Sequence, residues 1–172
     1  MDAKKKLITV PKEKCMLWTS PSGGTYRVSN RGTIHWQLKS GEWKRTGVSR
    51  NRLNGYHALG GGDKETKDRW SRLVHRVVAE LFIPNPDGLA EVDHIDRNRI
   101  NNRVENLRWV SHEQNAQNTL GRGCEKRGSR WRAYIYIKGN KKYLGTFDTE
   151  AEAHATYLAA KRVAHPFFVE EQ

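Results

Sequence analysis

Residues 130–138 alternate strictly between two kinds of side chain, and this pattern limits the fold more than any other in the chain. In an extended strand, successive side chains point to opposite faces. One face is then apolar and the other basic and aromatic: Trp131, Ala133, Ile135 and Ile137 against Arg132, Tyr134, Tyr136 and Lys138. The pair Gly139-Asn140 predicts a turn, and residues 141–147 predict a returning strand with Lys141 and Tyr143 on one side.

A helix is predicted directly after this hairpin. Thr149 and Glu152 form a capping box, and Pro166 ends the alanine-rich segment that follows. Its small residues are expected to let the helix lie close to the apolar face of the sheet: Ala151, Ala155, Ala159 and Ala160. The C-terminal part of the chain is therefore predicted to be a small sheet covered by one helix.

The N-terminal part shows short strand patterns separated by turns. Residues 26–28 and 33–36 suit a hairpin with one apolar face, formed by Tyr26, Val28, Ile34 and Trp36. Asn54-Gly55 predicts a second turn, and Gly60-Gly61-Gly62 is expected to break the strand that follows it. This part is predicted to be a β-rich module.

The pattern changes in the middle of the chain. Apolar residues at helical spacing over 73–82 predict a helix that Pro84 ends. A strand over 91–96, a polar loop over 97–105 and a strand over 107–110 follow, and a capping box of Ser111 and Gln114 predicts a helix to about 118. A linker is expected at 120–123. The predicted class is α+β with three modules, over 1–62, 63–119 and 120–172.

The charge is unevenly distributed along the chain. The net charge is +12, and the excess lies in residues 1–60 (12 Lys and Arg, 3 Asp and Glu) and 121–142 (8 against 1). Basic regions gain affinity for nucleic acid because they release the counterions condensed on the phosphates. Double-stranded DNA is the first partner to consider, although charge does not separate DNA from RNA and a merely basic surface is the alternative.

Several classes of protein are disfavoured by composition. No segment approaches the roughly 20 apolar residues of a membrane-spanning helix, and residues 7–10 are too few for the core of a signal peptide. Cys15 and Cys124 lack a second cysteine at CxxC spacing, so a zinc knuckle or disulfide framework is not expected. We expect reduced thiols and a cytoplasmic protein, with no membrane partner and no small-molecule substrate.

The residues suited to chemistry lie in two segments, 92–96 and 106–115. Hydrolysis of a phosphodiester requires a base to take a proton from water and positive charge to stabilise the phosphate. A histidine such as His94 suits the first task because its unperturbed pKa is about 6.5. A hard divalent cation bound by oxygen atoms suits the second. The alternative is structural, with Asp93 and His94 as a surface ion pair and Asn115 as a polar residue on a helix surface.

Asp93-His94, followed by Asn106 and by a helix that carries Asn115, resembles the HNH endonuclease motif on a ββα-metal fold. The resemblance covers about 72–118. Residues 74–79, 93–96 and 106–110 resemble the phage-encoded homing endonucleases, and residues 26–32 are similar to a motif often found near the N-terminus of those nucleases.

The resemblance implies a role for each matching residue. His94 would be the general base, Asn106 would orient its ring, and Asp93 and Asn115 would be the metal ligands. Both ligands are hard oxygens, which favours one magnesium or manganese ion in each site over zinc. Supporting or DNA-facing roles are expected for the neighbours Asp96, His112 and Asn118, and a packing or phosphate-contacting role for His75.

Residues 122–165, with Leu144-Gly145-Thr146-Phe147 before the helix, resemble the apetala-type, ethylene-response-factor DNA-binding domain. That domain has three strands packed on one helix and places its sheet in the major groove. The resemblance implies DNA contacts by one face of the sheet: Arg132, Tyr134, Tyr136, Lys141 and Tyr143. An amphipathic sheet with a merely solvated basic face is the alternative.

Together these features predict a site-specific HNH homing endonuclease of phage type. It would bind DNA as a monomer and nick one strand, leaving 5′-phosphate and 3′-hydroxyl ends. The alternatives are a non-catalytic DNA-binding regulator with a degenerate HNH motif and, with less support, an RNA-binding protein. One condition follows from strand geometry: Asp93 and His94 are adjacent, so they can share a site only if their strand ends or twists there.

Overall fold

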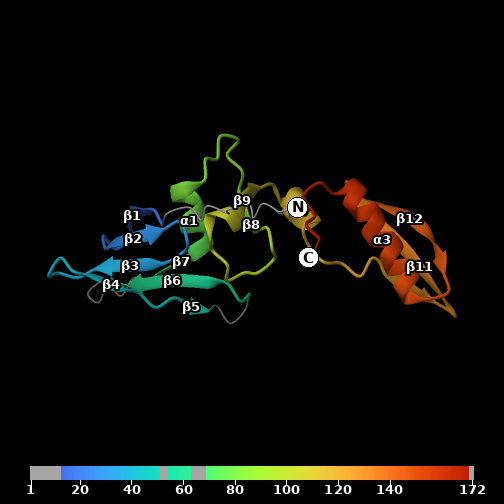
Figure 1. The fold of residues 1–172 in the computed structure, drawn as a ribbon, viewed down its shortest axis with the longest axis horizontal. Helices are drawn as coiled ribbons and strands as arrows, with labels where there is room; N and C mark the ends of the chain where they lie inside the picture. The colour runs from blue at the N-terminus through green and yellow to red at the C-terminus, as the bar shows by residue number, and fades with distance from the viewer. Residues whose placement is uncertain (1–12, 51–53, 63–68, 171–172) are drawn as a thin grey trace, which may run out of the picture. The chain divides into compact units, whose positions relative to one another are not determined.

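The computed structural model describes residues 13–50, 54–62 and 69–170. It confirms the α+β class, with small antiparallel sheets and few helices (Figure 1). The chain divides into two compact units: Met1–Ile83 with Ile100–Glu105, and Pro84–Arg99 with Asn106–Gln172. The division into three modules stays a prediction, and its boundary at 62/63 lies beside residues 63–68, outside the described residues.

No helix among the described residues is long and apolar enough to cross a membrane.

The first unit contains a four-stranded sheet in the order β1 (Cys15–Thr19), β2 (Thr25–Ser29), β3 (Ile34–Gln37) and β4 (Trp43–Arg45). The predicted hairpin is confirmed, since Tyr26 pairs with Trp36 and Val28 with Ile34. Val28 and Ile34 are buried, whereas Trp36 is 41% exposed. The apolar face of the hairpin is thus covered at only one end.

A second sheet of this unit contains β5 (Ser49–Arg50), β6 (His57–Gly62) and β7 (Arg69–Leu73). The expectation that Gly60-Gly61-Gly62 breaks the strand is wrong, because β6 continues through all three glycines and pairs with β7. The reason is the indole of Trp70, since a Cβ added to Gly61 would lie 2.9 Å from that ring. Glycine is needed here for a close approach and not for a turn.

Helix α1 (Val74–Phe82) follows β7 directly and confirms the predicted helical stripe. Val74, Val77 and Val78 are fully buried, as their spacing requires. The helix ends at Phe82, just before Ile83 and Pro84, because proline disfavours helical geometry in the residue before it.

The second unit begins with a two-stranded hairpin of β8 (Glu91–His94) and β9 (Leu107–Val110), in which Asp93 lies opposite Arg108. The 3-10 turn η1 (Val104–Asn106) leads into β9, and helix α2 (His112–Gln117) follows it. The predicted capping box is confirmed: Ser111 Oγ accepts from the Gln114 amide at 3.2 Å, and Gln114 Oε1 accepts from the Ser111 amide at 2.8 Å. The hairpin and α2 form the strand, strand and helix that the sequence predicts.

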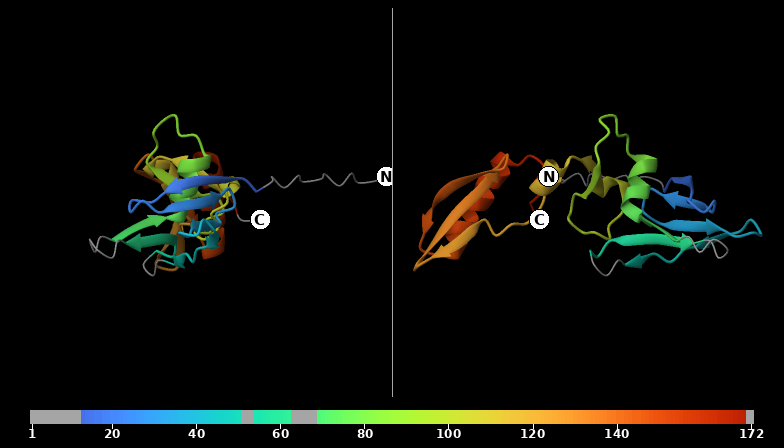
Figure 2. Two further views of the ribbon diagram at one scale, coloured as in Figure 1. Left: turned by 90° about the vertical axis from the view of Figure 1, so that its left-hand side faces the viewer. Right: turned by 180° about the vertical axis from the view of Figure 1, so that it is seen from behind.

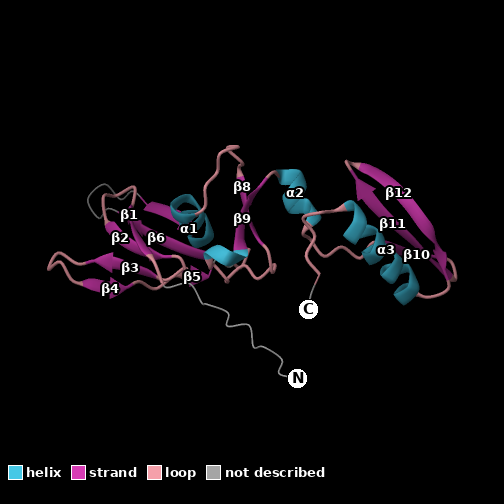
Figure 3. Cartoon of the chain, turned by 45° about the horizontal axis from the view of Figure 1, so that its top comes forward, coloured by secondary structure: helices cyan, strands magenta, loops and turns pink. Residues whose placement is uncertain are grey.

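The rest of this unit is an antiparallel sheet of β10 (Cys124–Arg127), β11 (Arg130–Ile137) and β12 (Asn140–Phe147). Helix α3 (Glu150–Ala164) lies along one face of it, as Figures 2 and 3 show. Its predicted capping box of Thr149 and Glu152 is present. The predicted alternation is confirmed, since Ala133 and Ile135 are buried beneath α3 and Tyr136 is 53% exposed.

The predicted helix face is wrong. Ala151, Ala155 and Ala159 are exposed, and the buried stripe is formed by Ala153, Tyr157 and Lys161. These three lie at i, i+4 and i+8, so they share one face of the helix. The tyrosine fits because residues 121–123, expected to be a linker, pack against it: a Cβ added to Gly123 would lie 1.9 Å from its ring.

Candidate functional site

Strand β8 ends at His94, which meets the condition that strand geometry sets for the site. The amide of Arg97, whose φ is +61°, donates to the carbonyl of His94 at 2.8 Å and closes a turn. Asn106, the last residue of η1, holds this turn, because its Oδ1 accepts from the Asp96 amide at 3.0 Å and its Nδ2 donates to Asp96 Oδ1 at 2.8 Å. The role of Asn106 toward the ring of His94 stays a prediction.

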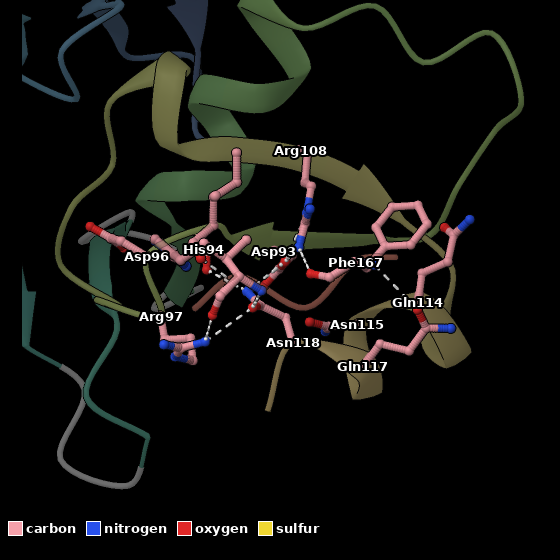
Figure 4. Close-up of polar contacts among 12 residues, drawn as sticks. Asp93, His94, Asp96, Arg97, Arg108, Gln114, Asn115, Gln117, Asn118 and Phe167 are labelled. Carbon is pink, nitrogen blue, oxygen red and sulfur yellow. Dashed lines mark hydrogen bonds and ion pairs between the residues drawn. The ribbon is translucent and has the colours of Figure 1, made fainter. Parts of the chain in front are cut away.

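Asp93 is buried, and its carboxylate accepts hydrogen bonds from a guanidinium and an amide, mostly at Oδ2 (Figure 4). Arg108, on the paired strand, donates to Asp93 Oδ2 from Nε at 2.9 Å and from Nη2 at 2.7 Å. Asn118, the residue that ends α2, donates from Nδ2 to Asp93 Oδ2 at 3.0 Å and to Oδ1 at 3.3 Å. A charge-assisted pair and a buried amide therefore fix the position of this carboxylate.

Glu91 lies two residues before Asp93 and so on the same face of β8. Its carboxylate accepts from Asn115 Nδ2 at 2.6 Å and pairs with His112 Nδ1 at 2.9 Å. Asn115 and Asn118, three residues apart, thus face two carboxylates of one strand. The sequence prediction missed Glu91, although its two-residue spacing from Asp93 could have indicated it.

The oxygen atoms of Asp93 and Asn115 are donors of the kind that a hard divalent cation accepts, and the identity of the ion stays a prediction. The described residues hold no group of three or more His, Cys, Asp and Glu side chains arranged for a metal. Within them, Asp93 Oδ1 has only the 3.3 Å contact with Asn118, and Asn115 Oδ1 accepts no hydrogen bond. One carboxylate and one amide oxygen are ligands that magnesium or manganese accepts, with water completing the coordination.

The remaining predicted residues lie in two places. The side chain of His94 is buried and follows Asp93 directly at the end of β8. His75 belongs to the first unit, where its ring lies 4.8 Å from that of Tyr56 on α1's packed side. The role of His75, in packing or in contact with phosphate, stays a prediction.

The outer face of the C-terminal sheet carries the predicted DNA-contacting residues together. Tyr134 pairs with Tyr143 and Tyr136 with Lys141 across β11 and β12. The ammonium of Lys141 lies 3.8 Å from the centre of the Tyr134 ring, and the guanidinium of Arg132 lies 5.4 Å from that of Tyr143. The face is therefore an exposed band of aromatic rings with cations beside them.

Comparison with known proteins finds a family match in the centre of the chain. Residues 72–117 match the HNH endonuclease family. This confirms the predicted family for the centre of the chain; the apetala-type resemblance of the C-terminal module stays a prediction.

The relatives include a phage enzyme. The chain is a homologue of the DNA endonuclease I-HmuI of Bacillus phage SP01, at 36% identity over 113 residues, which are 63% of this chain and 60% of that protein. It is 32% identical over 124 residues to the uncharacterized HNH endonuclease L245 of Acanthamoeba polyphaga mimivirus, which covers 72% of this chain and 35% of that protein. The chain thus spans less than two thirds of the length of these relatives.

A solved structure described as DNA binding and cleavage by the HNH homing endonuclease I-HmuI is also similar. It is 29% identical, and the match covers 74% of this chain and 76% of that one with a TM-score of 0.48.

Proposed function

We propose that this protein is a site-specific DNA endonuclease of the homing type that hydrolyses one phosphodiester bond and nicks one strand. The observation that carries the proposal is the pair Asp93-His94 at the end of β8, with α2 packed over the hairpin, inside the segment that matches the HNH family. The homology to a phage DNA endonuclease supports the substrate class. The enzyme would act inside the cell, where its DNA target lies.

Each residue has one task in the proposed reaction. His94 accepts the proton of the attacking water, for which an imidazole is suited near neutral pH. Asn106 keeps the end of β8 in place through its two hydrogen bonds to Asp96. Asp93 and Asn115 would hold a magnesium or manganese ion, which when bound stabilises charge on the phosphate and the leaving oxygen. The products are 5′-phosphate and 3′-hydroxyl ends.

The flanking parts of the chain hold the duplex. The basic and aromatic face of β11 and β12 supports DNA binding by the C-terminal module, in the manner of the apetala-type domain that it resembles. The N-terminal sheet contributes further basic strands. One chain with one hydrolytic site acts as a monomer on DNA, so it cuts one strand at a time.

The test requires a target site, which selection can supply. A genomic DNA library is incubated with the protein and Mg²⁺, new ends are sequenced, and the selected site is placed in a supercoiled plasmid. We expect open circles to form before any linear DNA. His94→Ala should lower the rate by about 100- to 10,000-fold without loss of DNA binding.

Controls separate chemistry from folding. His154→Ala removes a different histidine, whose Nδ1 contacts the carbonyl of Arg122 on the outer side of α3, and should keep the wild-type rate. Wild-type cleavage by His94→Ala would end the assignment of the base. Linear product without an open-circle intermediate would refute nicking.

A DNA-binding regulator without catalysis is the second candidate. One observation favours it: the carboxylate of Asp93 is paired with Arg108, and Asn115 donates to Glu91, so both proposed ligands already have protein partners. A regulator would give a gel shift in Mg²⁺ without new DNA ends. Competition between duplex DNA and duplex RNA of the same sequence separates either candidate from an RNA-binding protein.

A further inference from the structure

The segment after α3 returns to the hairpin of β8 and β9, and we call residues 167–169 the C-terminal strap. Among the described residues, four hydrogen bonds join its backbone to side chains of residues 97–118. The carbonyl of Phe167 accepts from Arg108 Nη2 at 2.6 Å, and the Phe167 amide donates to Gln117 Oε1 at 3.4 Å. The carbonyl of Val169 accepts from Arg97 Nη1 at 2.5 Å, and the Val169 amide donates to Asn118 Oδ1 at 3.3 Å. The strap therefore contacts β9, the turn after β8 and the end of α2.

Two side chains that the strap contacts are those that hold Asp93. Arg108 has its Nη2 shared between Phe167 O and Asp93 Oδ2, as Figure 4 shows. Asn118 accepts from the strap with its oxygen and donates with its nitrogen to Asp93. Each of these side chains joins the strap directly to the carboxylate.

Asn118 also fixes the backbone at the end of β8. Its Nδ2 lies 3.1 Å from the carbonyl of His94 and 3.1 Å from that of Ile95. The residue is only 2% exposed, so water cannot easily replace a lost partner. Loss of the Val169 amide would remove a hydrogen bond to the buried Oδ1 of Asn118, and the side-chain amide of Asn118 would then be held less firmly in its orientation.

The strap is anchored in the C-terminal module. The ring of Phe168 lies 4.8 Å from the ammonium of Lys161, which donates to the carbonyl of Thr119 and, at 3.0 Å, to the hydroxyl of Tyr157. His165, just before the strap, contacts the carbonyl of Tyr136 on β11 through Nε2 at 2.9 Å. A continuous set of contacts thus runs from the backbone of β11 through His165 and the strap to Asp93.

We propose that the C-terminal strap is a positioning element for the nuclease site. It fixes Arg108 and Asn118, and these side chains hold the Asp93 carboxylate and the end of β8 at His94. Hydrolysis therefore depends on a folded and docked C-terminal module, even when DNA is already bound. This inference rests on the proposed function for its effect on cleavage, although the coupling to β8 can be measured without it.

The test removes one hydrogen-bond donor. Val169→Pro deletes the amide that donates to Asn118, whereas the matched control Val169→Ala keeps the backbone donor and acceptor. We expect Val169→Pro to slow single-turnover nicking at least tenfold, with an unchanged Kd for the selected DNA in Ca²⁺. A higher Mg²⁺ concentration should then be needed for half-maximal cleavage. Val169→Ala should stay within twofold of wild type.

Hydrogen exchange supplies a readout that needs no activity. The amides of residues 91–96 should exchange faster in Val169→Pro than in Val169→Ala, whereas those of α3 should be unchanged. Equal exchange at 91–96, or equal nicking rates of the two variants, would overturn the proposal. A wild-type protein that produces no new ends in the DNA library would instead refute the proposed function, and hydrogen exchange alone would then decide whether the strap positions β8.

Discussion

Gly123→Ala should destabilise the C-terminal module severely, and the structure allows the cost to be estimated. The residue has φ of +61°, and an added Cβ would lie 1.9 Å from Cγ of Tyr157. The left-handed backbone alone costs an alanine about 1 to 2 kcal/mol. The ring, which is 6% exposed, must also leave its place, at a cost of about 3 kcal/mol by analogy with truncation of a buried aromatic residue.

Gly128→Ala is the matched control for this prediction. Its φ is +62°, but no atom lies within 4 Å of the added Cβ, so it carries the backbone cost without the clash. A module of about 50 residues has a stability of only about 3 to 7 kcal/mol. Gly123→Ala should therefore remove most of it, and Gly128→Ala should not.

The assay is hydrogen exchange of α3 followed by mass spectrometry, since local free energies of opening can be read from protected amides. The two variants should differ by about 3 kcal/mol, or roughly a hundredfold in the opening equilibrium. If the free energies of opening in Gly123→Ala and Gly128→Ala agree within about 0.5 kcal/mol, the usual range for a neutral surface change, the packing of residues 121–123 on Tyr157 is refuted.

Three further predictions concern a cap, a buried lysine and the exposed sheet face. Ser111→Ala removes the acceptor for the Gln114 amide and should destabilise α2 by about 1 kcal/mol, measured by exchange of residues 112–117. Burial, and secondarily the charge of Arg97, lower the pKa of Lys161. The stability that Lys161 contributes is thus present above the unfolded pKa of 10.5 and is lost as the pH falls through the lowered pKa. The free energy of unfolding of wild type, relative to that of Lys161→Met, should therefore rise with pH over this range. Lys141→Ala should weaken DNA binding and reduce the slope of log K against log salt by about 0.9.

Each of these predictions has a contrasting result. Ser129→Ala, an exposed serine in the turn between β10 and β11, should leave α2 unchanged. For Lys161, the prediction is contradicted if the free energies of unfolding of wild type and Lys161→Met change with pH in parallel. Tyr157, whose pKa is raised by burial, is present in both proteins. Lys142→Ala removes the same charge from the other face of β12, where it pairs with Ile135, and an equal change of slope would argue against a specific contact face.

Local patterns predicted most of the elements of the fold. Alternation identified the strand over 130–137, and hydrophobic spacing identified α1. The capping boxes at Ser111 and Thr149 placed the starts of two helices correctly. These signals act within a few residues, so one sequence is sufficient to show them.

Contacts between distant residues were not predictable in the same way. The glycines of β6 looked like a break because the ring of Trp70, which lies against Gly61, comes from another strand. The buried face of α3 was misplaced because Gly123, outside the helix, decides which side chain fits. Similarly, Arg108 was not recognised as the partner of Asp93, since only the register of β8 and β9 sets them opposite each other.

The alternation along β11 and β12 places the core residues of the module on one face of the sheet and the solvent-exposed residues on the other. Ala133 and Ile135 lie under the helix, whereas the neighbouring Tyr134 and Tyr136 contribute nothing to that core. Replacement of outer residues therefore leaves the packing intact. Substitutions on this outer face are therefore expected to change its charge and aromatic content at little cost in the stability of the module.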